Sequence, residues 1–99
     1  MTKPPKQPQP NITATLRGNS TFPWITLRGP GLPLIAMIGT LNVLLSAIDG
    51  GLEVLEADDG LGLRVQPKPG LTRTRPELFA ATRRLAQTQS EWRVKWEDD

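Results

Sequence analysis

The sequence predicts a small α+β domain in which strands and helices follow each other in the order ββαββα, with an antiparallel sheet and both helices on one of its faces. Apolar and polar residues alternate on both sides of two short turns, at 18–20 and 58–60. Each alternating pair is followed by a proline or glycine break and then by a helical pattern. With 99 residues, 37% of them hydrophobic, and no cysteine, the chain can bury one modest core without disulfides.

The first pair of strands is predicted within residues 12–28. The alternation puts aliphatic residues on one face and polar residues with one tryptophan on the other. The apolar face holds Ile12, Ala14, Leu16, Ile25 and Leu27, and the polar face holds Thr13, Thr15, Arg17, Trp24, Thr26 and Arg28. Because tryptophan usually hides most of its large apolar area, its place among arginines and threonines indicates a contact surface.

A helix is predicted over residues 33–48, with a proline in its first turn and Asp-Gly-Gly as its stop. Its apolar stripe comprises Leu34, Ile35, Met37, Ile38, Leu41, Leu44, Leu45 and Ile48. Its opposite side is small and uncharged, and includes Ala36, Gly39, Thr40 and Val43. A helix without a charged face is buried in its own core, in a subunit interface or in lipid. We therefore treat those four residues as the candidate oligomer interface.

A membrane span is the third possibility for this helix. The charge-free run 29–48 is twenty residues long, which is enough to cross a bilayer, and bases precede it while acids follow it. Gly-Pro-Gly at its start and Asn42 in its middle argue against a span. A soluble protein is the favoured interpretation, and a single-pass membrane protein is the least favoured one.

The second half repeats the order of the first. Residues 52–66 alternate around an Asp-Asp-Gly turn and place Arg64 opposite the apolar positions. Thr74 and Glu77 then form a capping box that opens the last helix, whose buried side begins with Leu78. The recurrence of strand, turn, strand, break and helix suggests a weak ββα repeat.

The two ends of the chain differ from the domain between them. Residues 1–11 are rich in proline and carry two lysines, which predicts a disordered basic arm, and residues 98–99 form an acidic tail. The domain is expected to span residues 12–97. As a strand, residues 91–97 put Trp92, Val94 and Trp96 on one face, whereas a helix would separate Val94 from the tryptophans. We favour a short terminal strand, and the helix remains open.

The composition argues against an enzyme. Histidine and cysteine are both absent, which removes the usual general base and the commonest zinc ligands. No residue set resembles a catalytic triad, and the acids within 49–63 lack the spacing of a calcium-binding loop. We therefore predict no catalytic residue, no metal site and no cofactor.

Charge is distributed in blocks, and the blocks favour a charged partner or self-association. Residues 1–48 carry four bases and no acid, residues 49–63 carry five acids and no base, and the whole chain has a net charge of +2. Arg17, Trp24, Thr26, Arg28 and Arg64 are expected on the uncovered face of the sheet. Such a basic face with an aromatic ring suits single-stranded nucleic acid. Arg73 and Arg75 could extend this surface by phosphate contacts.

Other partners fit the same residues. Trp24 would serve equally well at a core edge or in a dimer seam. The run Phe22-Pro23-Trp24-Ile25-Thr26-Leu27-Arg28-Gly29, placed between a strand and a helix, resembles a pattern in small proteins of actinobacterial phages. The resemblance covers a small part of the chain. It implies a phage accessory role, and it transfers no function to single residues. The positive start of the chain is followed by proline and glutamine instead of an apolar run and does not resemble a secretory signal, so a location in the host cytoplasm or the virion is expected. The sequence thus predicts a nucleic-acid-binding protein or, alternatively, an oligomeric structural or protein-binding module.

Overall fold

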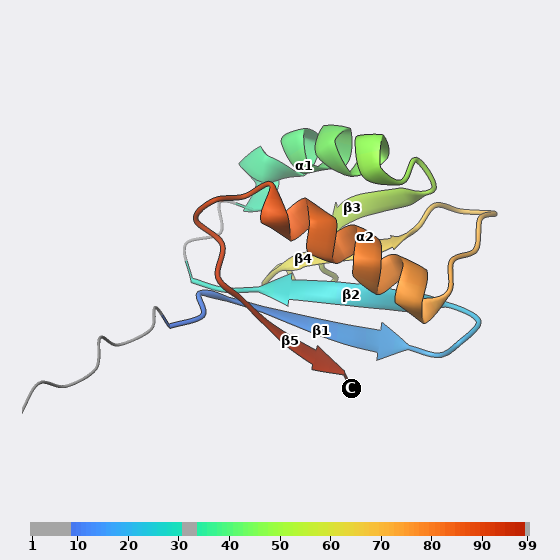
Figure 1. The fold of residues 1–99 in the computed structure, drawn as a ribbon, viewed down its shortest axis with the longest axis horizontal. Helices are drawn as coiled ribbons and strands as arrows, with labels where there is room; N and C mark the ends of the chain where they lie inside the picture. The colour runs from blue at the N-terminus through green and yellow to red at the C-terminus, as the bar shows by residue number, and fades with distance from the viewer. Residues whose placement is uncertain (1–8, 31–33, 99) are drawn as a thin grey trace, which may run out of the picture.

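The seven elements of the protein confirm the predicted α+β class and order, with the short terminal strand included. The computed structural model describes residues 9–30 and 34–98 (Figure 1). The elements are β1 (Ile12–Gly18), β2 (Pro23–Arg28), α1 (Leu34–Ile48), β3 (Leu52–Glu56), β4 (Leu63–Pro67), α2 (Arg75–Gln87) and β5 (Val94–Asp98). Most of the predicted arm, residues 1–8, lies outside the described residues. Asp98 belongs to β5 and not to a separate tail.

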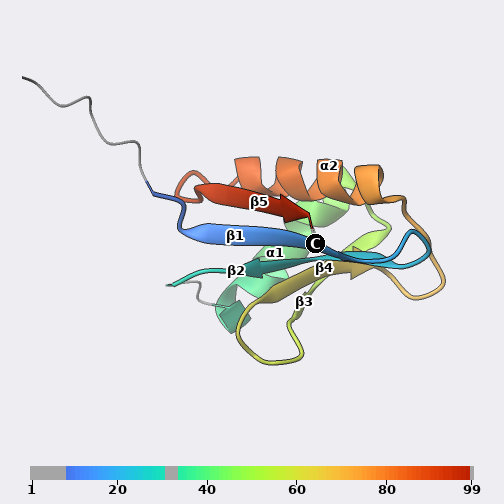
Figure 2. The same cartoon turned by 90° about the horizontal axis from the view of Figure 1, so that it is seen from below.

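The five strands form one mixed sheet in the order β3-β4-β2-β1-β5. The first four strands pair antiparallel, as expected, whereas β5 pairs parallel to β1. Both helices lie on the same face, which leaves the opposite face of the sheet open (Figure 2). The direction of β5 follows from α2, which carries the chain back to the end of the sheet where β1 begins, so that Val94 pairs with Ile12.

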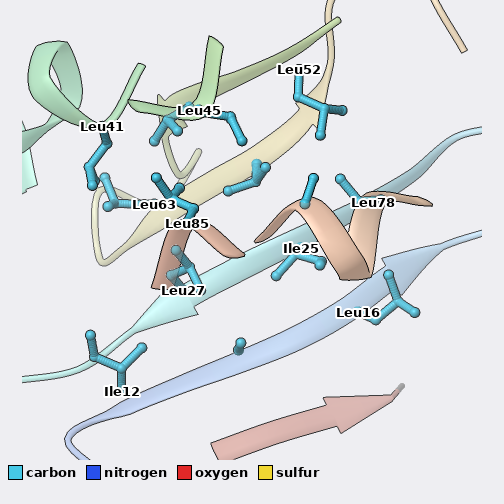
Figure 3. Packing of buried hydrophobic residues seen from close by; sticks show 14 residues of the cluster. Ile12, Leu16, Ile25, Leu27, Leu41, Leu45, Leu52, Leu63, Leu78 and Leu85 are labelled. Atoms are coloured by element: carbon cyan, nitrogen blue, oxygen red, sulfur yellow. The ribbon is translucent and has the colours of Figure 1, made fainter. Parts of the chain in front are cut away.

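The core lies between the sheet and the two helices (Figure 3). The alternation in the strands places the predicted aliphatic side chains there, with Ala14 and Leu27 fully buried. In α1, Leu41 and Leu45 are fully buried, and in α2 Leu78 and Leu85 are fully buried. Partly buried residues surround this centre, namely Met37, Ile38, Leu44, Ile48, Trp92, Val94 and Trp96.

Asn42 joins α1 to the edge of the sheet. Its Nδ2 donates to the carbonyl oxygen of Val54 at 2.8 Å, and its Oδ1 accepts from the Val54 N–H at 2.8 Å. The side-chain amide therefore takes the place of a neighbouring strand beside β3, which is otherwise an edge strand with unpaired backbone groups. This polar residue in the middle of an apolar helix is thus a structural contact.

The two ββα units meet at the antiparallel β2–β4 pair. Thr26 and Arg64 face each other at its centre, with Ile25 opposite Val65 and Leu27 opposite Leu63. Each unit contributes one inner and one outer strand, β2 with β1 and β4 with β3, but the helices lie differently, because α1 packs on β3 whereas α2 packs on β2 and β4. The predicted repeat of order therefore extends to the strand pairing and not to the helix positions, and β5 is an addition to it.

Asn11 is predicted to lie in the disordered arm, but the structure ties it to the C-terminal segment. Its side-chain amide donates to the Glu91 carbonyl oxygen at 2.9 Å and accepts from the Arg93 N–H at 2.8 Å. The carbonyl oxygen of Gln9 accepts from Arg93 Nε at 2.9 Å. Contacts this distant along the chain leave no local sequence signal. No helix in the described part of the chain is long and apolar enough to cross a bilayer.

Candidate nucleic-acid interface

The open face of the sheet gathers five of the predicted site residues around one hollow. The register of β1 and β2 places Arg17 opposite Trp24, and the register of β2 and β4 places Thr26 opposite Arg64. The hollow has a volume of about 250 Å³, and we call it the basic hollow. Its lining comprises Arg17, Trp24, Thr26, Arg28, Ala57, Asp58, Asp59 and Arg64.

Trp24 lies under an arginine. The guanidinium carbon of Arg64 is 4.3 Å from the centroid of the Trp24 ring, which is a cation–π contact. On another side the ring meets Gly18, where an added Cβ would come within 2.8 Å of its carbon atoms. Gly18 also has a φ of +79°, a conformation that other residues rarely adopt. Trp24 is therefore fixed in place between these two contacts. Arg64 covers one face of the indole ring, on which a nucleic-acid base was expected to stack.

The β3–β4 turn brings two acids to the basic hollow. Asp59 accepts from the Arg28 guanidinium at 2.5 Å and from the Leu61 N–H at 2.9 Å. These two donors, the Leu61 N–H first, lower the pKa of Asp59 below its usual range. Asp58 lies 3.6 Å from Arg64 and is almost fully exposed. The acids offset part of the positive charge, so the basic hollow carries three bases against two acids.

Thr26 and Arg64 each bring a buried polar atom without a hydrogen bond to the basic hollow. Within residues 9–30 and 34–98, neither Thr26 Oγ1 nor Arg64 Nε meets a partner. Buried polar atoms are nearly always paired in folded proteins, and an unpaired one costs free energy. Both atoms belong to the pair at the centre of the β2–β4 ladder. An added hydrogen-bonding group at this place on the open face would therefore stabilise the protein.

Arg73 and Arg75 do not line the basic hollow. Arg73 donates to both carboxylate oxygens of Asp49, with Nε and Nη2 each at 2.8 Å, and so joins the end of α1 to the start of α2. Arg75 pairs with Asp98 of β5 at 2.5 Å. Both arginines are therefore engaged within the fold, because each pairs with an acid that only the tertiary structure brings near.

The predicted oligomer residues lie on the outer side of α1. Ala36, Gly39, Thr40 and Val43 are all exposed, and Val43 keeps 71% of its surface accessible. An added Cβ on Gly39 would meet no atom within 4 Å. The small, uncharged side of α1 thus lies away from the core.

Asp58 and Asp59 are the charged residues of the basic hollow that sequence reasoning missed. The Asp-Asp-Gly pattern is typical of a solvated turn, and it predicts nothing more for these two acids. The one available signal is the acidic block that follows the basic one, and it cannot specify that Asp59 meets Arg28. That contact depends on the pairing of β2 with β4, which are separated by a helix and a strand.

No family model, curated protein or solved structure matches the chain. In the described ranges, no cluster of three or more histidines, cysteines, aspartates or glutamates could hold a metal ion.

Proposed function

We propose that the protein is a non-enzymatic accessory protein that binds single-stranded nucleic acid at the basic hollow. The observation that carries the proposal is the convergence of Arg17, Arg28 and Arg64 with Trp24 on one open sheet face. Arginine is the side chain best suited to phosphate, since its planar fork donates several hydrogen bonds. The phage context implied by the resemblance of Phe22–Gly29 remains part of this proposal.

The contact between Arg64 and Trp24 determines how a base would bind. With the guanidinium over the indole ring, a base stacks on the outer side of Arg64 and extends the stack by one layer. The neighbouring Arg17 and Arg28 then meet the phosphates. Trp24 acts as a positioning residue in this arrangement because it holds the guanidinium in place below the incoming base.

The unpaired atoms of Thr26 and Arg64 support an oxygen-rich ligand. Arg64 Nε is a donor, and the Thr26 hydroxyl can donate or accept. A phosphate that reaches these atoms along the edge of the guanidinium, with the face of the guanidinium still over Trp24, would give both atoms a partner and remove the cost of leaving them unpaired. An apolar ligand would leave that cost in place, so the basic hollow favours an anion.

Titration of a fluorescent oligothymidylate by anisotropy at several salt concentrations tests the proposal. We expect binding to weaken with salt, with a slope that falls by about 0.7 for each phosphate that the protein no longer binds. Arg17→Ala and Arg64→Ala should each lower the slope by about that amount. Arg84→Ala, on an exposed position of α2 away from the open face, is the matched control and should bind like the wild type.

A double-mutant cycle of Trp24 and Arg64, measured by the same binding assay, tests the role of Trp24. Trp24→Ala should weaken binding in the wild type but add little once Arg64 is alanine, because Trp24 acts through Arg64. Independent, additive losses would instead mean that the base stacks on Trp24 directly. Wild-type affinity in all three alanine variants, or no binding at low salt, would contradict the proposal.

The acids of the turn should weaken binding, because they occupy the positions next to Arg28 and Arg64 where phosphates would lie. Asp58→Asn with Asp59→Asn is expected to tighten binding roughly threefold to tenfold at low salt, and less at high salt. An unchanged affinity would mean that the acids do not compete with the ligand.

The second candidate function is an oligomeric structural or protein-binding module. It is favoured by the exposed, uncharged side of α1, where Val43 is largely accessible. Sedimentation over a wide concentration range should then show a dimer or larger species, and Val43→Lys should shift it to monomer. A wild-type monomer at every concentration would argue against this candidate.

A further inference from the structure

The two edges of the sheet differ in what lies beside them. At the β3 edge, the side chain of Asn42 binds both backbone groups of Val54. β5 forms the other edge, and within residues 9–30 and 34–98 its strand neighbour is β1 alone (Figure 1). An edge strand presents a row of backbone donors and acceptors to a further strand. β5 is therefore the place where the sheet can be extended.

The hydrogen bonds of Arg93, which directly precedes β5, determine which backbone groups of this strand point outward. Its carbonyl oxygen accepts from the Ile12 N–H at 3.2 Å, and its own N–H donates to Asn11 Oδ1 at 2.8 Å. Both backbone groups of Arg93 therefore face β1. Because the direction of these groups alternates along a strand, those of Lys95 and Glu97 also face β1. The residues with outward groups are Val94, Trp96 and Asp98.

The side chains of β5 divide between the two faces of the sheet. Val94 and Trp96 pack against the core on the helix side. The alternation places Lys95 and Glu97 on the open face, where Nζ and Oε1 are 3.4 Å apart. These two residues carry opposite charges and are equally spaced about Trp96. A strand with this pattern is complementary to an antiparallel copy of itself.

We propose that β5 pairs antiparallel with β5 of a second copy of the chain, with Trp96 at the centre of the pair. Lys95 then lies opposite the partner's Glu97, and Val94 lies opposite the partner's Asp98. Every residue with outward backbone groups thereby exchanges hydrogen bonds with the other copy. On the helix side the two Trp96 side chains meet, which covers apolar surface that is only partly buried in one copy.

Charge selects this register over its neighbours. Outward groups also face each other when the pair is centred on Lys95 or on Glu97. The first of these registers sets two lysines opposite each other and the second sets two glutamates opposite each other, and like charges in such positions are destabilising. Both also leave part of the outward groups unpaired. The register centred on Trp96 is therefore favoured by charge and by hydrogen bonding.

The resulting dimer would contain one sheet of ten strands, with the open faces of both copies on the same side. Because two strands of five residues bury less area than a standard interface, we expect it to dissociate on dilution. Two basic hollows on one continuous face would strengthen nucleic-acid binding, a gain that rests on the proposed function. The dimer itself does not depend on that function and is tested without nucleic acid.

Analytical ultracentrifugation of charge-reversal variants tests the pairing. The wild type should associate as its concentration rises. Lys95→Glu and Glu97→Lys each set like charges opposite each other at two places, so each should weaken the dimer roughly tenfold or more at low salt. An equimolar mixture of the two variants should regain wild-type association, because one copy then carries only acids at these positions and the other only bases. Circular dichroism should show that both variants fold.

Hydrogen exchange locates the contact within β5. The Trp96 amide points outward, so its exchange should become slower as the protein concentration rises, whereas the Lys95 amide faces β1 and should be protected throughout. Val43→Lys, on the outer side of α1, is the matched control and should leave this association unchanged. A wild-type monomer at every concentration, or a mixture of the two charge variants that stays monomeric, would overturn the proposal. So would a dimer that is lost in Val43→Lys and kept in Lys95→Glu.

Discussion

At the scale of single residues, several charged side chains of this protein pair with each other. Asp49, Asp59 and Asp98 each hold an arginine through a carboxylate, and each pair joins segments distant in sequence. Asp49 has the least exposed of these carboxylates, and its partner Arg73 binds both of its oxygens. This contact, more than the surface pairs, should therefore contribute measurably to stability.

Asp49→Asn should lower the free energy of unfolding by about 1–2 kcal/mol at neutral pH, since the variant cannot make the charged hydrogen bonds to Arg73. The hydrogen bond from Arg73 holds the pKa of Asp49 below its usual range. The contribution is therefore complete above about pH 4 and is lost as the pH falls through the lowered pKa. Urea denaturation at pH 7 and pH 3 should show the gap between wild type and variant closing in acid.

The exposed Asp58 provides the control for this measurement. Asp58→Asn should change the stability little at either pH, because its carboxylate is almost fully exposed and 3.6 Å from Arg64. A gap between wild type and Asp49→Asn that stays constant down to pH 3 would show that the ionised carboxylate is not the source of the effect.

At the scale of elements, the two helices pack on different parts of the sheet. α2 begins with the predicted capping box, in which Thr74 accepts from the Glu77 N–H and Glu77 accepts from the Thr74 N–H. It covers the centre of the sheet. α1 instead lies along β3 and closes that edge through Asn42 (Figure 1). The amide of Asn42 thus adds a polar contact to the apolar packing of Leu41 and Leu45.

Asn42→Ala should lower the free energy of unfolding by about 2–3 kcal/mol, because it leaves the N–H and the carbonyl of Val54 without their partners. Urea denaturation measures this decrease, and hydrogen exchange of the Val54 amide should become faster. Ser46→Ala, on an exposed position of the same helix, is the control and should be close to neutral. Unchanged exchange at Val54 in Asn42→Ala would contradict this role.

At the scale of the whole molecule, β5 completes a sheet that the two ββα units leave open beside β1. It is held by its parallel pairing with β1 and by Trp96, whose ring centroid lies 4.9 Å from the ring centroid of Phe79 on α2. Through Trp96, β5 therefore connects the edge of the sheet to α2, which itself covers the central strands β2 and β4.

Trp96→Ala should lower the free energy of unfolding by about 2–3 kcal/mol, less than a fully buried tryptophan would cost, because the side chain is only partly buried. Lys95→Ala, on the neighbouring position of the opposite face, should change it little. Urea denaturation compares the two variants. Equal stability of both would mean that β5 contributes through its backbone alone.

Local patterns were enough to predict the elements and their faces. The period of two placed Ile25 and Leu27 in the core and Trp24 and Thr26 on the open face, because side chains alternate along any strand. The grouping of side chains on the open face was predictable to the same extent. Arg17, Trp24, Thr26, Arg28 and Arg64 do meet, whereas Arg73 and Arg75 are held elsewhere by acids.

The sequence by itself determined the order of the elements, the buried face of each strand and the cap of the last helix, since these depend on neighbours a few residues apart. Only the tertiary structure decided that Arg64 lies over Trp24, that Asp59 meets Arg28 and that β5 runs parallel to β1. The reason is physical. An alternating pattern specifies which face a residue occupies, but the strand beside it depends on how the whole sheet packs against both helices.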